Sequence, residues 1–406
     1  MRLKNLLYAS LFLLSTTACA EKSVEVTVTN DSESDRSGEL VEIYKEHVQT
    51  KLRTYGTLVV LNESGEQVPY QLTNDGTILF PVSVKAGGQA VFTIKEGTPE
   101  KMDTVCHGGV YPKRLDDLAF ENDRMGWRVY GPGSQERNYK LYGYDLWSKR
   151  VDYPVLDKFY DMDRRLNEQK AELGKEGKKM SWEEEQKLSY HVDHGEGCDY
   201  YAVGPTLGAG TTAFISPTTG EMIYPWCYKT CEILDNGPLR FTARLTYDLV
   251  VSDVEVQETR LISLDKGSQM VKCTVWYSNI FSQLPLAAGV VMHKGSDQVE
   301  ISAEDGYAAY VEPADQTNGT NYLALVFPQT MDDIRVQPLS KNETEAAKGG
   351  ATGHVLGVTT YSPNDKFTYY FGAGYSKHGF ASAQEWFNYV KKFAADKRKP
   401  LKVSLK

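Results

Sequence analysis

The segment from residue 190 to residue 210 concentrates side chains that can exchange protons or bind a polar ligand. It reads YHVDHGEGCDYYAVGPTLGAG. Histidine titrates near neutral pH, and neighbouring carboxylates can orient an imidazole or act as acid and base themselves. A tyrosine phenol can also act as an acid or a base if its pKa is lowered. The candidate catalytic residues of this segment are His191, Asp193, His194, Glu196 and Tyr200.

We expect this segment to form a bent strand. On a strand, His191 and Asp193 share one face, and the two glycines that flank Glu196 permit a bend at which His194 joins them. Two other interpretations stay open. The groups can satisfy one another in a polar loop, or the HVDH pattern can supply metal ligands. Its spacing matches no zinc motif, so we expect no metal and no cofactor.

A second polar constellation, FENDRMGWRVYGPG, covers residues 120 to 133. Asp123 is a further candidate catalytic carboxylate, and Asn122, Arg124 and Tyr130 are candidate substrate-binding residues. Arginine is suited to bidentate pairing with the carboxylate of a uronic acid. The alternative is a buried Asp–Arg pair that fixes a strand corner.

Aromatic side chains provide further candidates for sugar binding, because their faces stack on the apolar faces of sugar rings. The chain contains 26 tyrosines, and the YGYDLW motif is suited both to stacking and to core packing. The histidines at positions 107, 354 and 378 are interpreted as structural. The remaining substrate-binding candidates are Tyr142, Trp147, Tyr201, Arg244 and His293.

Hydrophobic periodicity predicts a mainly β protein. Short alternating runs over residues 22–100 indicate a small N-terminal β-sandwich, and the larger domain is expected over residues 104–406. Within it, a three-stranded meander is predicted over 238–278, and the charged stretch 161–189 predicts an exposed helical insertion. The chain closes with an amphipathic helix. Strands do not alternate with long helices, which disfavours Rossmann and barrel α/β folds.

The first twenty residues have the pattern of an export signal, with a basic start, a short apolar run and small residues before position 20. Cys19 lies in a sequence that resembles a bacterial lipobox, so we expect lipidation at Cys19 and anchoring in the periplasm or outer membrane. A soluble secretory cleavage site is the alternative. Five cysteines remain, of which Cys227 and Cys231 are close enough for a local bridge.

The LDDLAFENDRMGWRVYGPG and HVDHGEGCDYYAVGPTLGAG runs, together with the signal, resemble an uncharacterised family of exported Bacteroidota proteins. That family is encoded in polysaccharide-utilisation clusters that also hold pectin-degrading enzymes. The larger domain also resembles the galactose-mutarotase type of β-supersandwich, a fold shared by sugar epimerases, polysaccharide lyases and accessory domains of glycosidases. Fold alone does not determine which of these activities is present.

These observations predict a carbohydrate-active enzyme, a lyase or a glycoside hydrolase, that acts on pectin-like oligosaccharides containing uronic acid. The alternatives are a surface glycan-binding lipoprotein without turnover and a sugar mutarotase or epimerase. The net charge of −9 argues against nucleic acid as a partner. The expected partners are an acidic oligosaccharide and, through Cys19, a membrane, whereas the oligomeric state stays open.

Overall fold

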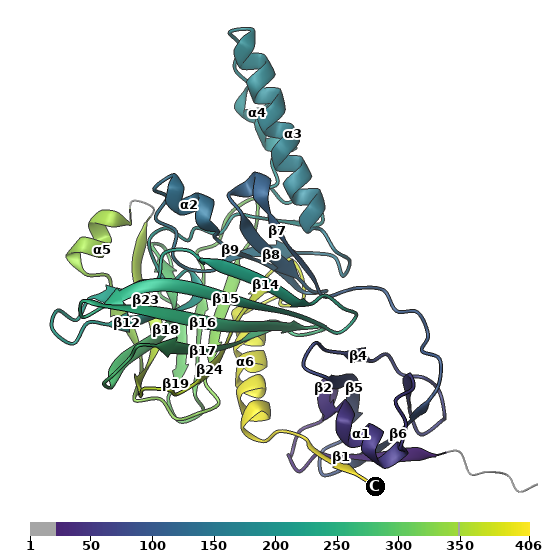
Figure 1. The fold of residues 1–406 in the computed structure, drawn as a ribbon. Helices are drawn as coiled ribbons and strands as arrows, with labels where there is room; N and C mark the ends of the chain where they lie inside the picture. Colours follow the sequence, from purple (N-terminus) through teal and green to yellow (C-terminus); the bar gives the residue numbers. More distant parts are fainter. Residues whose placement is uncertain (1–21, 348–349) are drawn as a thin grey trace, which may run out of the picture.

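The computed structural model describes residues 22–347 and 350–406. Figure 1 shows a small N-terminal unit, a larger β-rich body and a helical hairpin that projects from that body. The signal segment 1–20 and Cys19 lie outside the described residues. The fold is mainly β, as the periodicity predicts: a small β-sandwich precedes a large antiparallel β-supersandwich that carries a helical insertion and a C-terminal helix.

The N-terminal unit consists of two small sheets and one helix around a shared apolar core. Alternate positions of its strands point inward, for example Val24, Val26 and Val28, and pack against Phe80 and Phe92. The four-stranded sheet contains, in order, β25 (Lys402–Leu405), β1 (Ser23–Thr29), β6 (Gln89–Glu96) and β3 (Leu58–Leu61). The three-stranded sheet contains β2 (Arg36–Tyr44), β5 (Thr77–Val84) and β4 (Gln71–Leu72), and α1 (Lys45–Leu52) follows β2.

The last strand of the chain belongs to this first unit. β25 pairs antiparallel with β1, with Val26 opposite Leu405 and Thr29 opposite Lys402. The expected boundaries, 22–100 and 104–406, therefore assign the final residues to the wrong unit. Pairing of the two chain ends covers an edge of the small sheet that would otherwise be open.

Two large antiparallel sheets face one another in the body. Their inner faces form one continuous core, which includes Leu245, Leu286, Leu323, Val355 and Phe371. The five-stranded sheet contains β13 (Met222–Ile223), β12 (Ala209–Ile215), β18 (Leu284–His293), β23 (Ala351–Tyr361) and β22 (Asp333–Pro338). The eight-stranded sheet contains β14 (Thr230–Asp235), β15 (Arg240–Val251), β16 (Val254–Asp265), β17 (Met270–Ser278), β24 (Phe367–Tyr375), β21 (Asn321–Val326), β20 (Tyr307–Val311) and β19 (Val299–Ser302).

The predicted meander over 238–278 is confirmed as β15, β16 and β17. β15 and β16 pair in register from Arg240–Asp265 to Val251–Val254. The turn residues between them, Ser252 and Asp253, have φ values of 50° and 64°, which matches the left-handed geometry of a tight hairpin. β16 then pairs with β17 through eight positions, from Gln257–Ser278 to Leu264–Val271.

A third sheet, of five strands, covers one side of the body. Its inward rings contact the eight-stranded sheet: Phe120 stacks on Phe241, and Trp127 meets Phe371 edge-on, each pair with ring centroids 5.0 Å apart. The strands, in order, are β11 (Gly197–Cys198), β10 (Asp145–Lys149), β9 (Met125–Val129), β8 (Asp117–Glu121) and β7 (His107–Tyr111). A 3₁₀ turn (Pro112–Arg114) and α2 (Pro132–Glu136) lie in its connections.

The expected helical insertion is a hairpin of α3 (Leu156–Lys175) and α4 (Trp182–Leu188) that projects from the third sheet (Figure 1). α3 begins before residue 161 because Leu156 and Phe159 are buried against Trp147 of β10. Most of the remaining hairpin surface is charged and exposed. The short α5 (Lys341–Ala346) precedes β23. No helix of the described residues is both long and apolar enough to cross a bilayer.

The C-terminal helix α6 (Ala383–Arg398) packs on the outer face of the eight-stranded sheet, as its amphipathic pattern predicts. Trp386 is fully buried, and its indole N–H donates to the Leu323 carbonyl at 3.0 Å. Val390 and Ala394 continue the same buried face. α6 therefore covers β20 and β21 and leads the chain toward the N-terminal unit (Figure 1).

A buried ion pair joins the third sheet to the base of α3. Lys149 Nζ lies 2.5 Å from Glu121 Oε2, and both side chains are fully buried. Glu121 also accepts hydrogen bonds from the backbone N–H groups of Val155 and Leu156 at 2.8 to 3.0 Å, so it satisfies donors at the start of α3. Loss of either charge leaves the other buried without compensation.

We predict that Glu121→Gln lowers the free energy of unfolding by about 3–5 kcal/mol, because it leaves the Lys149 ammonium buried and unpaired. Glu232→Gln is the matched control, since Glu232 forms an ion pair with Arg244 in which both side chains are about half exposed. Its expected cost is below about 1 kcal/mol. Urea denaturation of both variants measures the difference, and equal costs would contradict a structural role for the buried pair.

His354 supplies a pH-dependent part of the stability. It is buried on β23, and burial, together with nearby His293, lowers the pKa of His354 to about 4, although Glu343 opposes the shift. The unfolded chain therefore binds a proton that the folded chain excludes. The pH-dependent part of the free energy of unfolding is therefore fully present above pH 6.5 and is lost as pH falls toward 4. It amounts to about 3 kcal/mol.

We predict that His354→Gln, which retains an acceptor for the Leu207 N–H, loses less stability than the wild type between pH 7 and pH 4.5. Urea denaturation at several pH values measures this slope. His47→Gln, on the exposed surface of α1, is the control and should keep the wild-type slope. Parallel slopes for His354→Gln and the wild type would exclude His354 as the titrating group.

Candidate functional site

The 190–210 segment is a turn-rich loop rather than the expected bent strand, and of residues 190–203 only Gly197–Cys198 is in a strand. Gly195 and Gly197 have φ values of 107° and 111°. A Cβ atom on Gly197 would lie 1.9 Å from the Ser148 carbonyl oxygen. Gly197 therefore lets the loop backbone approach β10 closely, where pairing covers two residues.

The two imidazoles of this loop bind its own backbone. His191 Nδ1 lies 2.6 Å from the Asp199 carbonyl, and His194 Nε2 lies 3.0 Å from the Ser189 carbonyl. Both residues are exposed. These contacts match the interpretation of a polar loop whose groups satisfy one another.

Asp193 organises the same loop from inside. Its side chain is fully buried and lies 3.1 Å from both Arg150 Nη1 and Lys377 Nζ. It also accepts hydrogen bonds from the N–H groups of Gly195 and Gly197 at 2.8 and 3.2 Å. Burial favours the neutral carboxyl, but these donors hold the pKa of Asp193 below its usual value.

The other two candidates of the loop also have structural surroundings. Glu196 accepts a hydrogen bond from Tyr153 at 2.7 Å and forms an ion pair with Lys158 of α3. Burial raises the pKa of Tyr200 far above that of a free phenol, and its hydroxyl has no partner among the described residues. A neutral phenol of this kind is a poor base at neutral pH.

The Asn122–Arg124 corner faces the 265–268 turn. Asn122 is fully buried and donates to the carbonyls of Asp265 and Ser268 at 2.6 and 2.8 Å, so its expected role in substrate binding is corrected to that of a corner residue. Asp123 accepts from the Gly267 N–H at 2.6 Å. Arg124, half exposed, lies 3.4 Å from the Asp123 carboxylate and lines a groove described below.

Two further binding candidates lie in different environments from those expected. Trp147 is 0% exposed and packs against Phe159, Tyr160 and Tyr190, so no face of its ring is free for a sugar. This corrects its expected role, because YGYDLW places it on the side of β10 that α3 covers. Arg244 forms an exposed ion pair with Glu232 on the neighbouring strand.

Tyr142 forms part of an aromatic shelf, the name used here for Tyr142, Tyr224 and Trp226. Tyr142 stacks on Tyr224 with ring centroids 5.1 Å apart, and Trp226 meets Tyr142 edge-on at 6.3 Å. All three residues are partly exposed. A partly exposed set of aromatic rings is the kind of surface on which sugar rings stack.

A buried charge cluster is centred on Arg128 of β9. Arg128 Nη2 forms an ion pair with Asp145 and lies 3.2 Å from Asp199 Oδ2. Tyr130 donates to Asp145 Oδ2 at 3.0 Å. Burial, with Asp199 nearby, raises the pKa of Asp145 to about 7, although Arg128 opposes the shift. Nε and Nη1 of Arg128 have no partner among the described residues.

Tyr201 connects this cluster to a second pair of groups. Burial raises the pKa of Tyr201, and the carboxylates of Glu312 and Asp145 both add to the shift, so Tyr201 lies within electrostatic range of each. Its ring meets the His293 imidazole edge-on at a centroid distance of 5.8 Å. Tyr130 and Tyr201 are each 8% exposed.

His293 and Glu312 form a hydrogen-bonded imidazole–carboxylate pair, called the His293–Glu312 pair below. His293 ends β18, and Glu312 follows β20. His293 Nδ1 lies 2.9 and 3.1 Å from the two Glu312 oxygens, and the His293 N–H donates to Tyr310 Oη at 2.9 Å. Burial raises the pKa of Glu312, although its hydrogen bond with His293 opposes the shift.

The outer nitrogen of this pair is available for chemistry. His293 Nε2 has no hydrogen-bond partner among the described residues, and the side chain is 12% exposed. A carboxylate on Nδ1 fixes the orientation and the tautomer of an imidazole and leaves Nε2 as the nitrogen that can contact a ligand. Tyr224 of the aromatic shelf donates to Glu343, and both Glu343 and His293 act electrostatically on His354.

The sequence patterns mark His293, Tyr130 and Tyr201 as binding candidates but do not mark their acidic partners Asp145 and Glu312. Asp145 lies within YGYDLW, where the aromatic residues dominate the pattern. Asp199 was part of the titratable run, but nothing in the sequence distinguished it from its neighbours. Glu312 ends a short apolar strand, and a carboxylate immediately after YAAYV is the signal that could have identified it.

The described residues contain no group of three or more His, Cys, Asp or Glu side chains arranged to hold a metal ion. The five described cysteines are free thiols, so Cys227 and Cys231 are not bridged. Burial raises the pKa of Cys227 to about 11 and that of Cys231 to about 12, which keeps both protonated at neutral pH.

Comparison with solved structures shows the fold. The chain matches an α-mannosidase from Enterococcus faecalis V583 with a TM-score of 0.51 and 11% identity over 95% of this chain and 46% of that one. It matches a glycosyl hydrolase family 38 protein from Enterococcus faecalis with a TM-score of 0.50 and 10% identity over 95% of this chain and 48% of that one. The chain spans about half the length of these solved structures.

Comparison of sequences shows the family. The chain is 25% identical over 415 residues to an uncharacterized protein P7 from Formosa agariphila, covering 96% of this chain and 95% of that protein. A family model described as a domain of unknown function matches residues 28–403. The match spans both structural units, and the chain therefore belongs to the family named Domain of unknown function (DUF4861).

Proposed function

We propose that this protein is a carbohydrate-active enzyme that performs acid–base chemistry on an oligosaccharide containing uronic acid. The observation that carries the proposal is the His293–Glu312 pair, which holds an imidazole by Nδ1 and leaves Nε2 without a partner among the described residues. The fold supports it, because the solved structures that the chain matches are described as an α-mannosidase and a glycosyl hydrolase family 38 protein.

The imidazole favours β-elimination over hydrolysis. A hydrolase with two carboxylates needs both of them at the sugar, but Asp145 and Asp199 are at most 2% exposed. An imidazole instead suits removal of the proton on the carbon next to the uronate carboxyl. His293 Nε2 takes the C5 proton, a C4–C5 double bond forms, and the C4–O bond breaks. The leaving oxygen takes a proton from the imidazolium, directly or through a bridging water molecule, which restores the neutral imidazole.

The surroundings of the His293–Glu312 pair support a sugar ligand with an acidic group. The aromatic shelf supplies ring faces for stacking. Arg128 lies next to Tyr130 and keeps two nitrogens unused by the described residues. Those nitrogens are buried, so Arg128 acts on a nearby uronate carboxylate through its positive charge rather than by direct contact.

Glycan binding without turnover is the second candidate, and the aromatic shelf favours it. Three partly exposed rings at one surface bind sugars without any contribution from His293. The two functions differ in what each side chain does. An enzyme needs His293 for turnover and the shelf for binding, whereas a binding protein needs the shelf alone.

We predict that His293→Gln lowers turnover of an acidic oligosaccharide substrate by about 10²–10⁴-fold with little change in affinity, because Nε2 acts in proton transfer rather than in binding. Glu312→Gln should lower turnover in the same direction. Absorbance of the unsaturated uronate product across a panel of pectic oligosaccharides measures turnover, and calorimetry measures affinity. His47→Gln is the control and keeps wild-type turnover. Full activity of His293→Gln, or no product from any substrate in the wild type, would refute the enzymatic proposal.

We predict that Tyr142→Ala weakens binding of the same oligosaccharides about 3–10-fold, since it removes one stacking face of the shelf. Tyr55→Ala removes a phenol that is 94% exposed in the N-terminal unit and serves as the matched control. Calorimetry at constant pH and ionic strength measures both. If Tyr142→Ala binds as tightly as Tyr55→Ala, the shelf is not a sugar-binding surface.

A further inference from the structure

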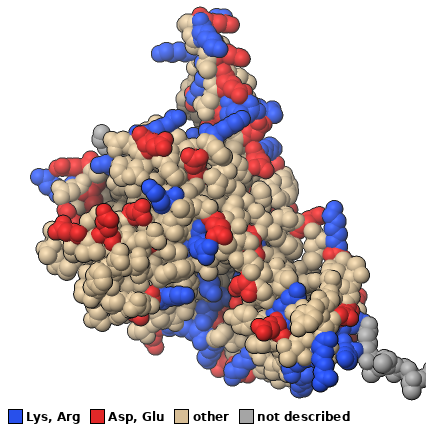
Figure 2. Space-filling model, in the orientation of Figure 1, with Lys and Arg blue, Asp and Glu red and all other residues tan. Residues whose placement is uncertain are grey.

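A groove of about 530 Å³ separates the outer face of the eight-stranded sheet from the N-terminal unit and α6. Its walls come from the start of β2, the second half of α6, the β15–β17 strands with the turn at 265–268, Arg124, and Tyr370 of β24. In Figure 2, Lys and Arg side chains gather in the region between the two units. None of the residues of the His293–Glu312 pair, the Arg128 cluster or the aromatic shelf lines this groove.

The carboxylates that line the groove are already paired with cations. Asp265 and Glu42 both bind Arg240, at 2.5 to 2.9 Å. Asp396 lies 2.6 Å from Lys392, and Asp35 lies 2.6 Å from Lys85. The fifth lining carboxylate, that of Glu39, binds Arg36 at 2.8 Å.

Two lysines of the groove have no such partner among the described residues. Lys266 lies exposed in the turn after β16, and Lys272 lies half-buried on β17. The register places Lys272 between Ser263 on β16 and Tyr370 on β24, so an ammonium, a hydroxyl and an aromatic ring form one row across the outer face. With its carboxylates neutralised, the groove presents uncompensated positive charge, although the whole chain has a net charge of −9.

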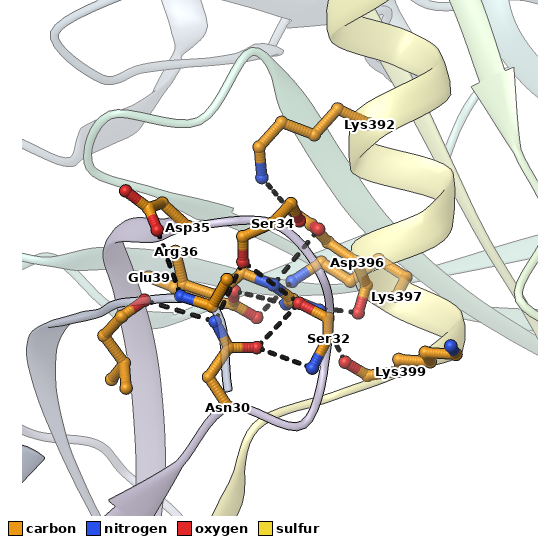
Figure 3. A network of polar contacts seen from close by, with 12 residues as sticks. Asn30, Ser32, Ser34, Asp35, Arg36, Glu39, Lys392, Asp396, Lys397 and Lys399 are labelled. Carbon is orange, nitrogen blue, oxygen red and sulfur yellow. Dashed lines mark hydrogen bonds and ion pairs between the residues drawn. The ribbon is translucent and has the colours of Figure 1, made fainter. Parts of the chain in front are cut away.

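The wall opposite this row is held in place before any ligand arrives. Arg36 of β2 is 2% exposed, and its guanidinium binds Glu39, the Asp396 carboxylate at 3.1 Å and the Lys399 carbonyl at 2.6 Å (Figure 3). These contacts fix β2 of the N-terminal unit to the end of α6. A preformed site loses less conformational entropy on binding than one that must close.

We infer that this groove is a second binding site, one that takes an anionic oligosaccharide and is separate from the His293–Glu312 pair. Lys266 and Lys272 bind the acidic groups, while Ser263 and Tyr370 contact hydroxyls and a ring face. The volume lies within the range of small-molecule sites and suits a few sugar rings. The saccharide class rests on the proposed function, whereas the preference for an anion rests on the two lysines.

The test is calorimetry with tetragalacturonate on the full chain, with a sulfated tetrasaccharide and neutral maltotetraose as comparison ligands. We expect Lys272→Glu to weaken tetragalacturonate binding about tenfold and Lys266→Ala to weaken it about threefold. We expect little maltotetraose binding at the groove and a smaller salt dependence in Lys272→Glu than in the wild type. Lys179→Glu, an exposed charge reversal between α3 and α4, is the matched control and stays within about twofold of the wild type.

The outcomes separate this groove from the proposed active site. Loss of one binding event in Lys272→Glu, with the event that Tyr142→Ala weakens left unchanged, supports the groove, whichever acidic group, carboxylate or sulfate, is preferred. Equal affinity of Lys272→Glu and Lys179→Glu for every anionic saccharide overturns the groove and leaves the His293–Glu312 pair untouched. Binding of phosphatidylglycerol vesicles in place of any saccharide also overturns it. Circular dichroism of each variant confirms that the fold is retained.

Discussion

The surroundings of the proposed active site depend on a single buried cation, Arg128. Its guanidinium contacts one carboxylate from β10 and another from the loop after α4. Neither carboxylate can be buried as an anion without that charge, and the arginine cannot be buried without at least one of them. The pair of contacts therefore fixes where the loop meets the third sheet, and that position orients Tyr201 against His293.

The excess of carboxylates over cations has a chemical consequence. Because burial and Asp199 raise the pKa of Asp145 to about 7, the cluster retains a proton near neutral pH. Tyr130 donates to the same carboxyl, so its hydroxyl is fixed in one orientation. Tyr201 joins this cluster to the His293–Glu312 pair, in which Glu312 binds Nδ1 of the imidazole.

The sequence predicts those parts of the molecule that depend on local periodicity. Alternation identified the β15–β17 meander, and the apolar stripe at Trp386 and Val390 identified the docked C-terminal helix. β25 was missed because four residues contain too little pattern to show that they pair with the opposite end of the chain. Such pairing is decided by tertiary contacts rather than by local preference.

The site was harder to predict because burial, rather than residue type, distinguishes its members. His191 and Asp193 have the right chemistry, but glycine-dependent contact with β10 turns their segment into a closed loop. Asp145 and Glu312, by contrast, lie at strand ends where sequence pattern carries little information. Burial and neighbouring charged groups shift the pKa of a titratable side chain and so suit it to a function. The residues that bury it and the charges beside it come from segments remote in sequence.

The N-terminal unit supplies one wall of the groove, which the large domain does not form alone. Its β2 strand, fixed through Arg36 to α6, forms one wall of the groove, and the pairing of β25 with β1 holds the unit at that place. β1 and β25 therefore take part in the same attachment. An acidic chain held between the two units would meet positive charge on an otherwise negative protein, which raises its local concentration near the body that carries the His293–Glu312 pair. Contact at two places favours longer chains over single sugars, because the second contact forms within a complex that already exists.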